Sequence, residues 1–247
     1  MNREVRSVVL MLFGVTVLRL CWEGAYTRYV KPTMLVPLVL SGVLLVALGL
    51  LALARIVREG RGTDADPHDH EAHDADDAQS DGHAHGSLRA AWLLLLPVAT
   101  IFLVAPPALG AYTASREQST VLPSDTELFS PLPAGSVSEL TLNDFATRAV
   151  WDGGKTLTGR SVRMTGFVTA APDGGWYLTR LMLTCCAADA LATKILMVDP
   201  SQTPAVDSWV TVTGKWTPGG NLNTDDAIPW FTADSITAVA APDNPYE

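Results

Sequence analysis

Histidine is confined to one stretch of this 247-residue chain, and all five copies lie between residues 68 and 85. Elsewhere the chain has no imidazole to serve as a general base or a metal ligand. The motifs GxSxG, HExxH and GxGxxG and the nucleotide-binding P-loop are also absent. The sequence therefore gives no support to an enzyme, and we expect a protein without catalytic activity.

Basic residues and cysteines are scarce as well. The chain has 17 Lys and Arg against 26 Asp and Glu, a formal net charge of −9, and no basic patch for nucleic acid. Three cysteines without regular spacing exclude a disulfide scaffold. Because Cys21 ends an apolar run, Cys185 and Cys186 are the only thiols of the C-terminal half.

Long apolar runs are what the N-terminal part has instead. They predict a membrane domain over residues 1–115, with spans at about 5–22, 33–54 and 90–112 in contact with the lipid bilayer. The first run could also be a signal peptide, but no A-x-A cleavage site follows Cys21, which favours a retained helix. Arg19 lies near the end of this run, where its side chain can reach the interface.

The distribution of basic residues predicts the orientation. With the N-terminus and the 55–89 loop in the cytoplasm, most arginines near the spans are cytoplasmic: Arg3, Arg6, Arg55, Arg58, Arg61 and Arg89. Only Arg28, Lys31 and Arg116 then lie on the other side. We therefore expect a multi-pass cell-membrane protein whose C-terminal domain is extracytoplasmic.

The loop over residues 60–88 is rich in histidine and aspartate. Its low hydrophobicity and negative charge predict disorder. Imidazoles interleaved with carboxylates can capture zinc weakly, although the spacing fits no fixed tetrahedral site. The loop is either such a flexible metal tract or a solvated linker; the candidate ligands are His68, His70, His73, His83 and His85.

A linker over residues 116–138 leads to a small, mainly β domain over residues 139–247. Thr141 as N-cap, an apolar stripe and Gly153-Gly154 predict one short helix from Thr141 to Trp151. Alternating patterns then predict five strands, at 162–169, 176–184, 194–199, 209–215 and 230–239. The expected fold class is α + β: three N-terminal transmembrane helices and a barrel like the oligonucleotide/oligosaccharide-binding (OB) fold. A sandwich is the alternative.

The segment Thr184-Cys185-Cys186-Ala187-Ala188-Asp189-Ala190 follows the second predicted strand. Adjacent residues of an extended chain point to opposite faces, so the two thiols can converge only in a turn. Three hypotheses remain open. Cys185, Cys186 and Asp189 could bind a soft metal with a further ligand from elsewhere, the thiols could form a redox-active vicinal pair, or the cysteines could be small buried side chains.

The chain resembles the YcgQ-like family of bacterial permease subunits over most of its length. The residues that carry the resemblance are Cys185-Cys186-Ala187-Ala188-Asp189-Ala190, Trp209-Val210-Thr211-Val212-Thr213-Gly214 and Pro242-Asp243-Asn244-Pro245-Tyr246. The resemblance implies a larger polytopic membrane permease as partner, and a connection to zinc homeostasis.

We therefore expect an accessory subunit of a bacterial membrane permease, concerned with transport or homeostasis of a divalent metal such as zinc. Its extracytoplasmic β-domain would present Cys185, Cys186 and Asp189 to the metal. The alternative is a membrane-tethered module for thiol redox chemistry or ligand binding.

Overall fold

The computed structural model describes residues 3–61, 96, 99–100, 103–104, 107–122, 129–220, 222, 224 and 226–247. The chain divides into two compact units. The first contains two long helices, α1 (Arg3–Trp22) and α2 (Leu35–Arg61). The second combines the segment Thr27–Lys31, which connects those helices, with the chain from Pro107 to Glu247. The short 3₁₀ turns η1 (Ala25–Arg28) and η2 (Pro32–Met34) lie between α1 and α2.

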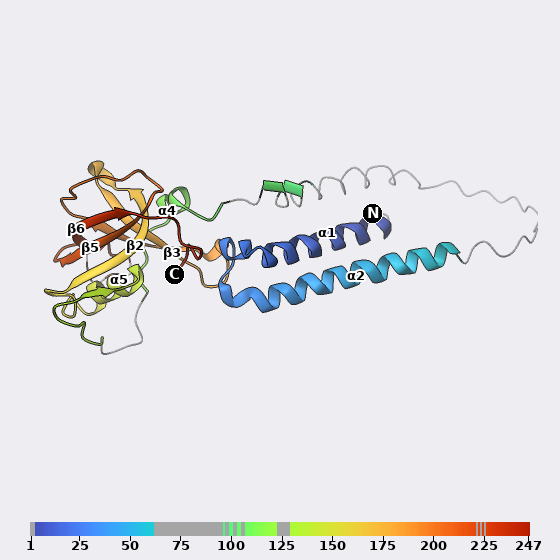
Figure 1. Ribbon diagram of the computed structural model, residues 1–247, viewed down its shortest axis with the longest axis horizontal. Helices are drawn as coiled ribbons and strands as arrows, with labels where there is room; N and C mark the ends of the chain where they lie inside the picture. The colour runs from blue at the N-terminus through green and yellow to red at the C-terminus, as the bar shows by residue number, and fades with distance from the viewer. Residues whose placement is uncertain are drawn as a thin grey trace, which may run out of the picture. The chain divides into compact units, whose positions relative to one another are not determined.

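Helices α1 and α2 pack along each other within the first unit (Figure 1). Three glycines, Gly14, Gly42 and Gly49, lie at the contact and bring the two helix backbones close together. A Cβ atom on Gly49 would lie 2.5 Å from Cγ of Met11, and one on Gly14 would lie 2.7 Å from Cγ2 of Val46. Small residues at helix contacts are typical of membrane helices, in which close van der Waals packing drives association.

Within the described part of the chain, one helix is long and apolar enough to cross a membrane. It covers Pro32–Arg58, near the N-terminus, and includes the span expected at 33–54. The span expected at about 5–22 forms the continuous helix α1, but its apolar sequence contains the charged residues Arg6 and Arg19. About half of the span expected at 90–112 lies outside the described residues, and its last residues open the helix α4 (Ala111–Arg116) of the second unit. The structure thus supports one of the three expected spans.

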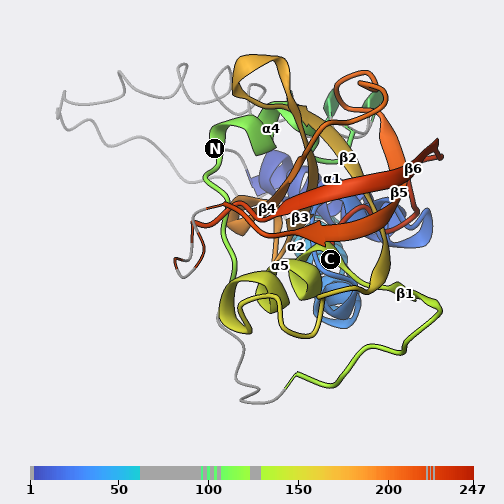
Figure 2. The ribbon, with the colours of Figure 1, turned by 90° about the vertical axis from the view of Figure 1, so that its left-hand side faces the viewer.

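The second unit has mixed α + β structure around a six-stranded sheet (Figure 2). Its strands are β1 (Val137–Glu139), β2 (Ser161–Ala170), β3 (Trp176–Met182), β4 (Leu191–Met197), β5 (Trp209–Thr217) and β6 (Trp230–Ala238). The order is β1-β2-β3-β4-β6-β5, with a further pairing between β2 and β5. All pairs are antiparallel except β1–β2 and β4–β6. All five expected strands are present, and β1 is an addition that the sequence did not predict.

Helix α5 (Leu142–Trp151) confirms the predicted helix and its start. The hydroxyl of Thr141 accepts the backbone N–H of Asp144 at 3.0 Å, as an N-cap side chain should. Phe145 is buried against Phe231 of β6, with ring centroids 5.5 Å apart in an edge-to-face arrangement. The apolar face of α5 therefore belongs to the main core of the unit, together with side chains of β2 to β6.

Part of the expected linker over residues 116–138 packs against the second unit, around Ser119 and Val121. Ser119 forms a bridge with Ala192 of β4, and the N–H of Thr120 donates to the carbonyl of Ala192 at 2.7 Å. Val121 is fully buried in a small cluster with residues of α5. A Ser/Thr/Pro-rich composition indicates a connector, but such backbone pairing with a distant strand leaves no local pattern.

Candidate metal centre

The segment after β3 forms a tight turn that the carboxylate of Asp189 organises. Strand β3 ends at Met182, and the turn closes in the short 3₁₀ helix η4 (Ala187–Asp189). The Asp189 carboxylate accepts backbone N–H groups from Thr184 at 3.1 Å, Cys185 at 2.8 Å and Cys186 at 3.3 Å. The turn that the sequence required for convergence of the two thiols is therefore present.

The turn brings together the three residues that the sequence singled out. One ligand atom from each of Cys185, Cys186 and Asp189 lies within 4.8 Å of the others. Two ligands of one tetrahedral zinc ion are about 3.5–3.8 Å apart, given bond lengths of about 2.0–2.3 Å. A contraction of about 1 Å, within reach of side-chain rotation, would be enough. Cys185 is exposed and Cys186 half-buried, so an ion can reach the group from solvent.

The hydrogen bonds within the turn also determine the protonation of Cys185 and Asp189. Two hydrogen bonds of the exposed Cys185 thiol raise its pKa to about 11: the one with Asp189 has the larger effect, and the one with Cys186 the smaller. The hydrogen bond from Cys185 and the three backbone N–H groups hold the pKa of Asp189 below its ordinary value. At neutral pH Asp189 is therefore ionised, and Cys185 keeps its proton unless a cation replaces it.

The thiol turn, residues 184–189, also pairs with the segment that connects α1 and α2. Val30 and Cys186 form an antiparallel bridge. The N–H of Lys31 donates to the carbonyl of Cys185 at 3.1 Å, and the N–H of Ala187 donates to the carbonyl of Tyr29 at 2.7 Å. Backbone hydrogen bonds on both sides of Cys186 thus fix the turn against Thr27–Lys31, a contact that the sequence gave no sign of.

Comparison with family models matches the DUF1980 N-terminal domain to residues 5–119 and the DUF1980 C-terminal domain to residues 148–247. The chain has both DUF1980 domains. The N-terminal DUF1980 domain includes α1, α2 and α4, and the C-terminal DUF1980 domain includes strands β2 to β6 and the thiol turn. A search of curated proteins found no similar sequence.

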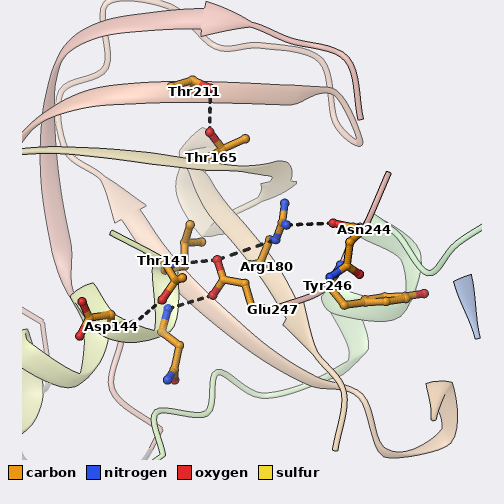
Figure 3. Close-up of polar contacts among 10 residues, drawn as sticks. Thr141, Asp144, Thr165, Arg180, Thr211, Asn244, Tyr246 and Glu247 are labelled. Atoms are coloured by element: carbon orange, nitrogen blue, oxygen red, sulfur yellow. Dashed lines mark hydrogen bonds and ion pairs between the residues drawn. The ribbon is translucent and has the colours of Figure 1, made fainter. Parts of the chain in front are cut away.

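The last two residues of the DUF1980 C-terminal domain make contacts that sequence analysis missed. Figure 3 shows the ion pair of Glu247 with Arg180. The Tyr246 hydroxyl accepts the N–H of Leu109 at 2.9 Å and donates to the carbonyl of Arg28 at 2.7 Å. Glu247 donates its N–H to the carbonyl of Leu181 on β3 at 3.0 Å. Tyr246 thereby joins three segments that are far apart in the sequence.

The Glu247 carboxylate lies at the start of α5, beside a cleft of about 590 Å³. It accepts the N–H groups of Leu142 at 3.0 Å and Asn143 at 3.2 Å, where a helix favours negative charge. The guanidinium of Arg180 lies 3.8 Å from this carboxylate, donates to the carbonyl of Asn244 at 3.2 Å, and stacks on the ring of Trp209 at 4.7 Å. Glu247 and Arg180 therefore connect the C-terminal segment to the start of α5 and to β3.

The other predicted ligands, His68, His70, His73, His83 and His85, lie outside the described residues. The metal hypothesis for the histidine-rich loop stays a prediction.

Proposed function

We propose that this DUF1980 protein is a membrane-anchored accessory subunit that binds a thiophilic divalent metal ion, zinc above all, at Cys185, Cys186 and Asp189. The observation that carries the proposal is the convergence of two sulfur atoms and a carboxylate oxygen within 4.8 Å on an exposed turn. Thiolate and carboxylate ligands of this kind suit zinc. The turn supplies three ligands, which leaves a fourth position for water or for a partner.

The electrostatics of the turn favour a cation. Ionised Cys185 beside the charged Asp189 is unfavourable, as the raised pKa of the Cys185 thiol indicates. A divalent ion removes this repulsion and releases the Cys185 proton. Metal affinity should therefore rise with pH, by about tenfold per unit for this proton below pH 11.

The same pKa disfavours the redox alternative. The thiolate is the form that attacks a disulfide, and reactive cysteines have lowered pKa values. Cys185 has a raised pKa because its thiol is hydrogen-bonded to the Asp189 carboxylate and to Cys186. This environment therefore favours slow thiol–disulfide exchange at neutral pH.

The partner in this proposal is a polytopic membrane permease of the kind that the YcgQ-like resemblance implies, and the cargo is the metal. The proposed architecture has three membrane spans, a cytoplasmic N-terminus, and an extracytoplasmic OB-like barrel. Support for the barrel comes from strand pairing, since β2-β3-β4-β6-β5 returns to β2. Support for the anchor comes from the apolar helix at Pro32–Arg58.

Metal content and free thiols of the full chain in detergent test the proposal. The protein is purified under reducing conditions, dialysed against zinc, and measured in a background in which the five histidines are replaced by asparagine. We expect a single zinc ion per chain that is lost in Cys185→Ser/Cys186→Ser and kept in the matched Cys21→Ser control. Zinc retained by the double-serine variant, or absent once the histidines are removed, would overturn the proposal.

A further inference from the structure

A cleft of about 520 Å³ opens between α1 and α2 in the first unit. It lies where the first turns of α1 meet the last turns of α2, and its charged residues are Arg6 and Arg55. It is independent of the thiol turn and of the metal proposal.

The packing of the two helices explains the cleft. At Gly49 the helices are in contact, since a Cβ atom there would lie 3.0 Å from the carbonyl oxygen of Ser7. Ser7 is fully buried at this contact. One turn further along α2, the small side chain of Ala52 contributes to the lining, and the longer side chains around it border open space.

The chemistry of the lining is amphipathic. Arg6 and Arg55 supply two positive charges, and none of the described residues that line the cleft is acidic. The other large lining side chains are apolar, among them Leu48 and Leu51, which are 47% and 60% exposed. Two guanidinium groups match the geometry of a phosphate, whereas exposed leucines match a hydrocarbon chain.

We propose that this cleft binds one anionic phospholipid, whose headgroup phosphate lies between Arg6 and Arg55 and whose acyl chain covers Leu48 and Leu51. Arg55 lies near the end of the helix Pro32–Arg58, which is long and apolar enough to cross a membrane. This is the depth at which phospholipid headgroups meet a membrane helix, and basic pockets between helices there bind anionic lipids. A free phosphate ion would leave the apolar lining uncovered, which is why a lipid is the better match.

Native mass spectrometry of the full chain in neutral detergent tests the proposal, with phosphatidylglycerol and phosphatidylcholine added in turn. We expect one phosphatidylglycerol to remain bound, and Arg6→Gln or Arg55→Gln to weaken its binding by about fivefold each. Arg58→Gln removes the same charge from the same helix but not from the cleft, so it should bind as wild type does.

A second variant tests the cleft apart from its charge. Ala52→Phe fills the space and keeps both arginines, so it should also reduce phosphatidylglycerol binding, with helical content checked by circular dichroism. Three results would overturn the proposal. They are equal retention of the two lipids, equal losses in Arg55→Gln and Arg58→Gln, and complete displacement of the lipid by inorganic phosphate.

Discussion

At the scale of single residues, Asp189 combines two roles in the thiol turn. It fixes the backbone by accepting three N–H groups. It also offers the carboxylate that keeps Cys185 protonated. The residue that shapes the turn therefore also controls when Cys185 can become a metal ligand.

Replacing Asp189 by asparagine should lower the pKa of Cys185 from about 11, because the negative charge and the strongest acceptor beside the thiol are lost. Since the thiolate is the reactive form, alkylation of Cys185 at pH 8 should become faster by about tenfold or more. Tandem mass spectrometry can locate the label on Cys185 or Cys186. Asp243→Asn, which removes an exposed carboxylate elsewhere, is the control, and an unchanged rate in Asp189→Asn would contradict the assignment.

Glu247 should make the free energy of unfolding decrease as pH rises, whereas an ordinary paired carboxylate makes it increase. Burial raises its pKa above the ordinary 4.5, so the folded chain keeps a proton that the unfolded chain has released. Its contribution to the free energy of unfolding therefore decreases as pH rises from 4.5 through the folded pKa.

Denaturant unfolding from pH 4 upward measures this effect, and Glu247→Gln should flatten the decrease. Glu139→Gln is the control, since it removes a carboxylate from the exposed rim of the same cleft. Identical pH profiles for wild type and Glu247→Gln would show that Glu247 does not contribute in this way.

At the scale of elements, the C-terminal segment holds the second unit together through Tyr246. Its ring is buried with Phe167, Leu181 and Ala114, and its hydroxyl bonds the backbone at Leu109 and Arg28. Through Tyr246, the residues before α4 and the residues between α1 and α2 are thus attached to the end of β3, where Tyr246 pairs with Leu181.

Tyr246→Phe keeps the ring and removes both hydrogen bonds. The loss should lower the free energy of unfolding of the second unit by about 2 kcal/mol. Denaturation followed by tryptophan fluorescence measures it. Tyr112→Phe, at a side chain that is 71% exposed, should have no comparable effect, and equal stability of the two variants would contradict the role of Tyr246.

Local patterns were enough to predict the helix α5 and five strands, because an N-cap threonine, paired glycines and alternating apolar residues act within a few positions. Strand β1 was missed because three residues are too short for a pattern, and it exists through parallel pairing with β2. Strand β4 begins at Leu191, before the expected Lys194, because Ala192 and Thr193 are small or polar but buried.

The sequence was enough to predict which residues form the candidate site, but not which distant segments pack against it. Cys185, Cys186 and Asp189 stand together in the sequence, and a turn was the one local conformation that could unite them. The bridge from Cys186 to Val30 joins residues more than 150 positions apart, and the contacts of Tyr246 reach as far. Such pairings depend on the tertiary fold, which no local pattern encodes.

At the scale of the whole molecule, the segment Thr27–Lys31 belongs to the second unit although it connects the two helices of the first. The chain therefore enters the second unit twice. If α1 and α2 both cross the membrane, as proposed, this segment and the C-terminal domain lie on the same side.

Protease treatment of intact cells or spheroplasts tests that arrangement. Residues 116–247 should be removed from the outside if they have the orientation that the arginine distribution predicts. The same treatment after membrane disruption controls for intrinsic resistance of the folded domain. Full protection in intact spheroplasts, with digestion after disruption, would reverse the orientation.

X-ray absorption of the zinc-loaded full chain tests the central claim most directly, because it reports the atoms bound to the metal. The account predicts two sulfur ligands at about 2.3 Å, with oxygen or nitrogen at about 2.0–2.1 Å completing the shell. A shell of nitrogen and oxygen alone would contradict it and assign the metal to the histidine-rich loop.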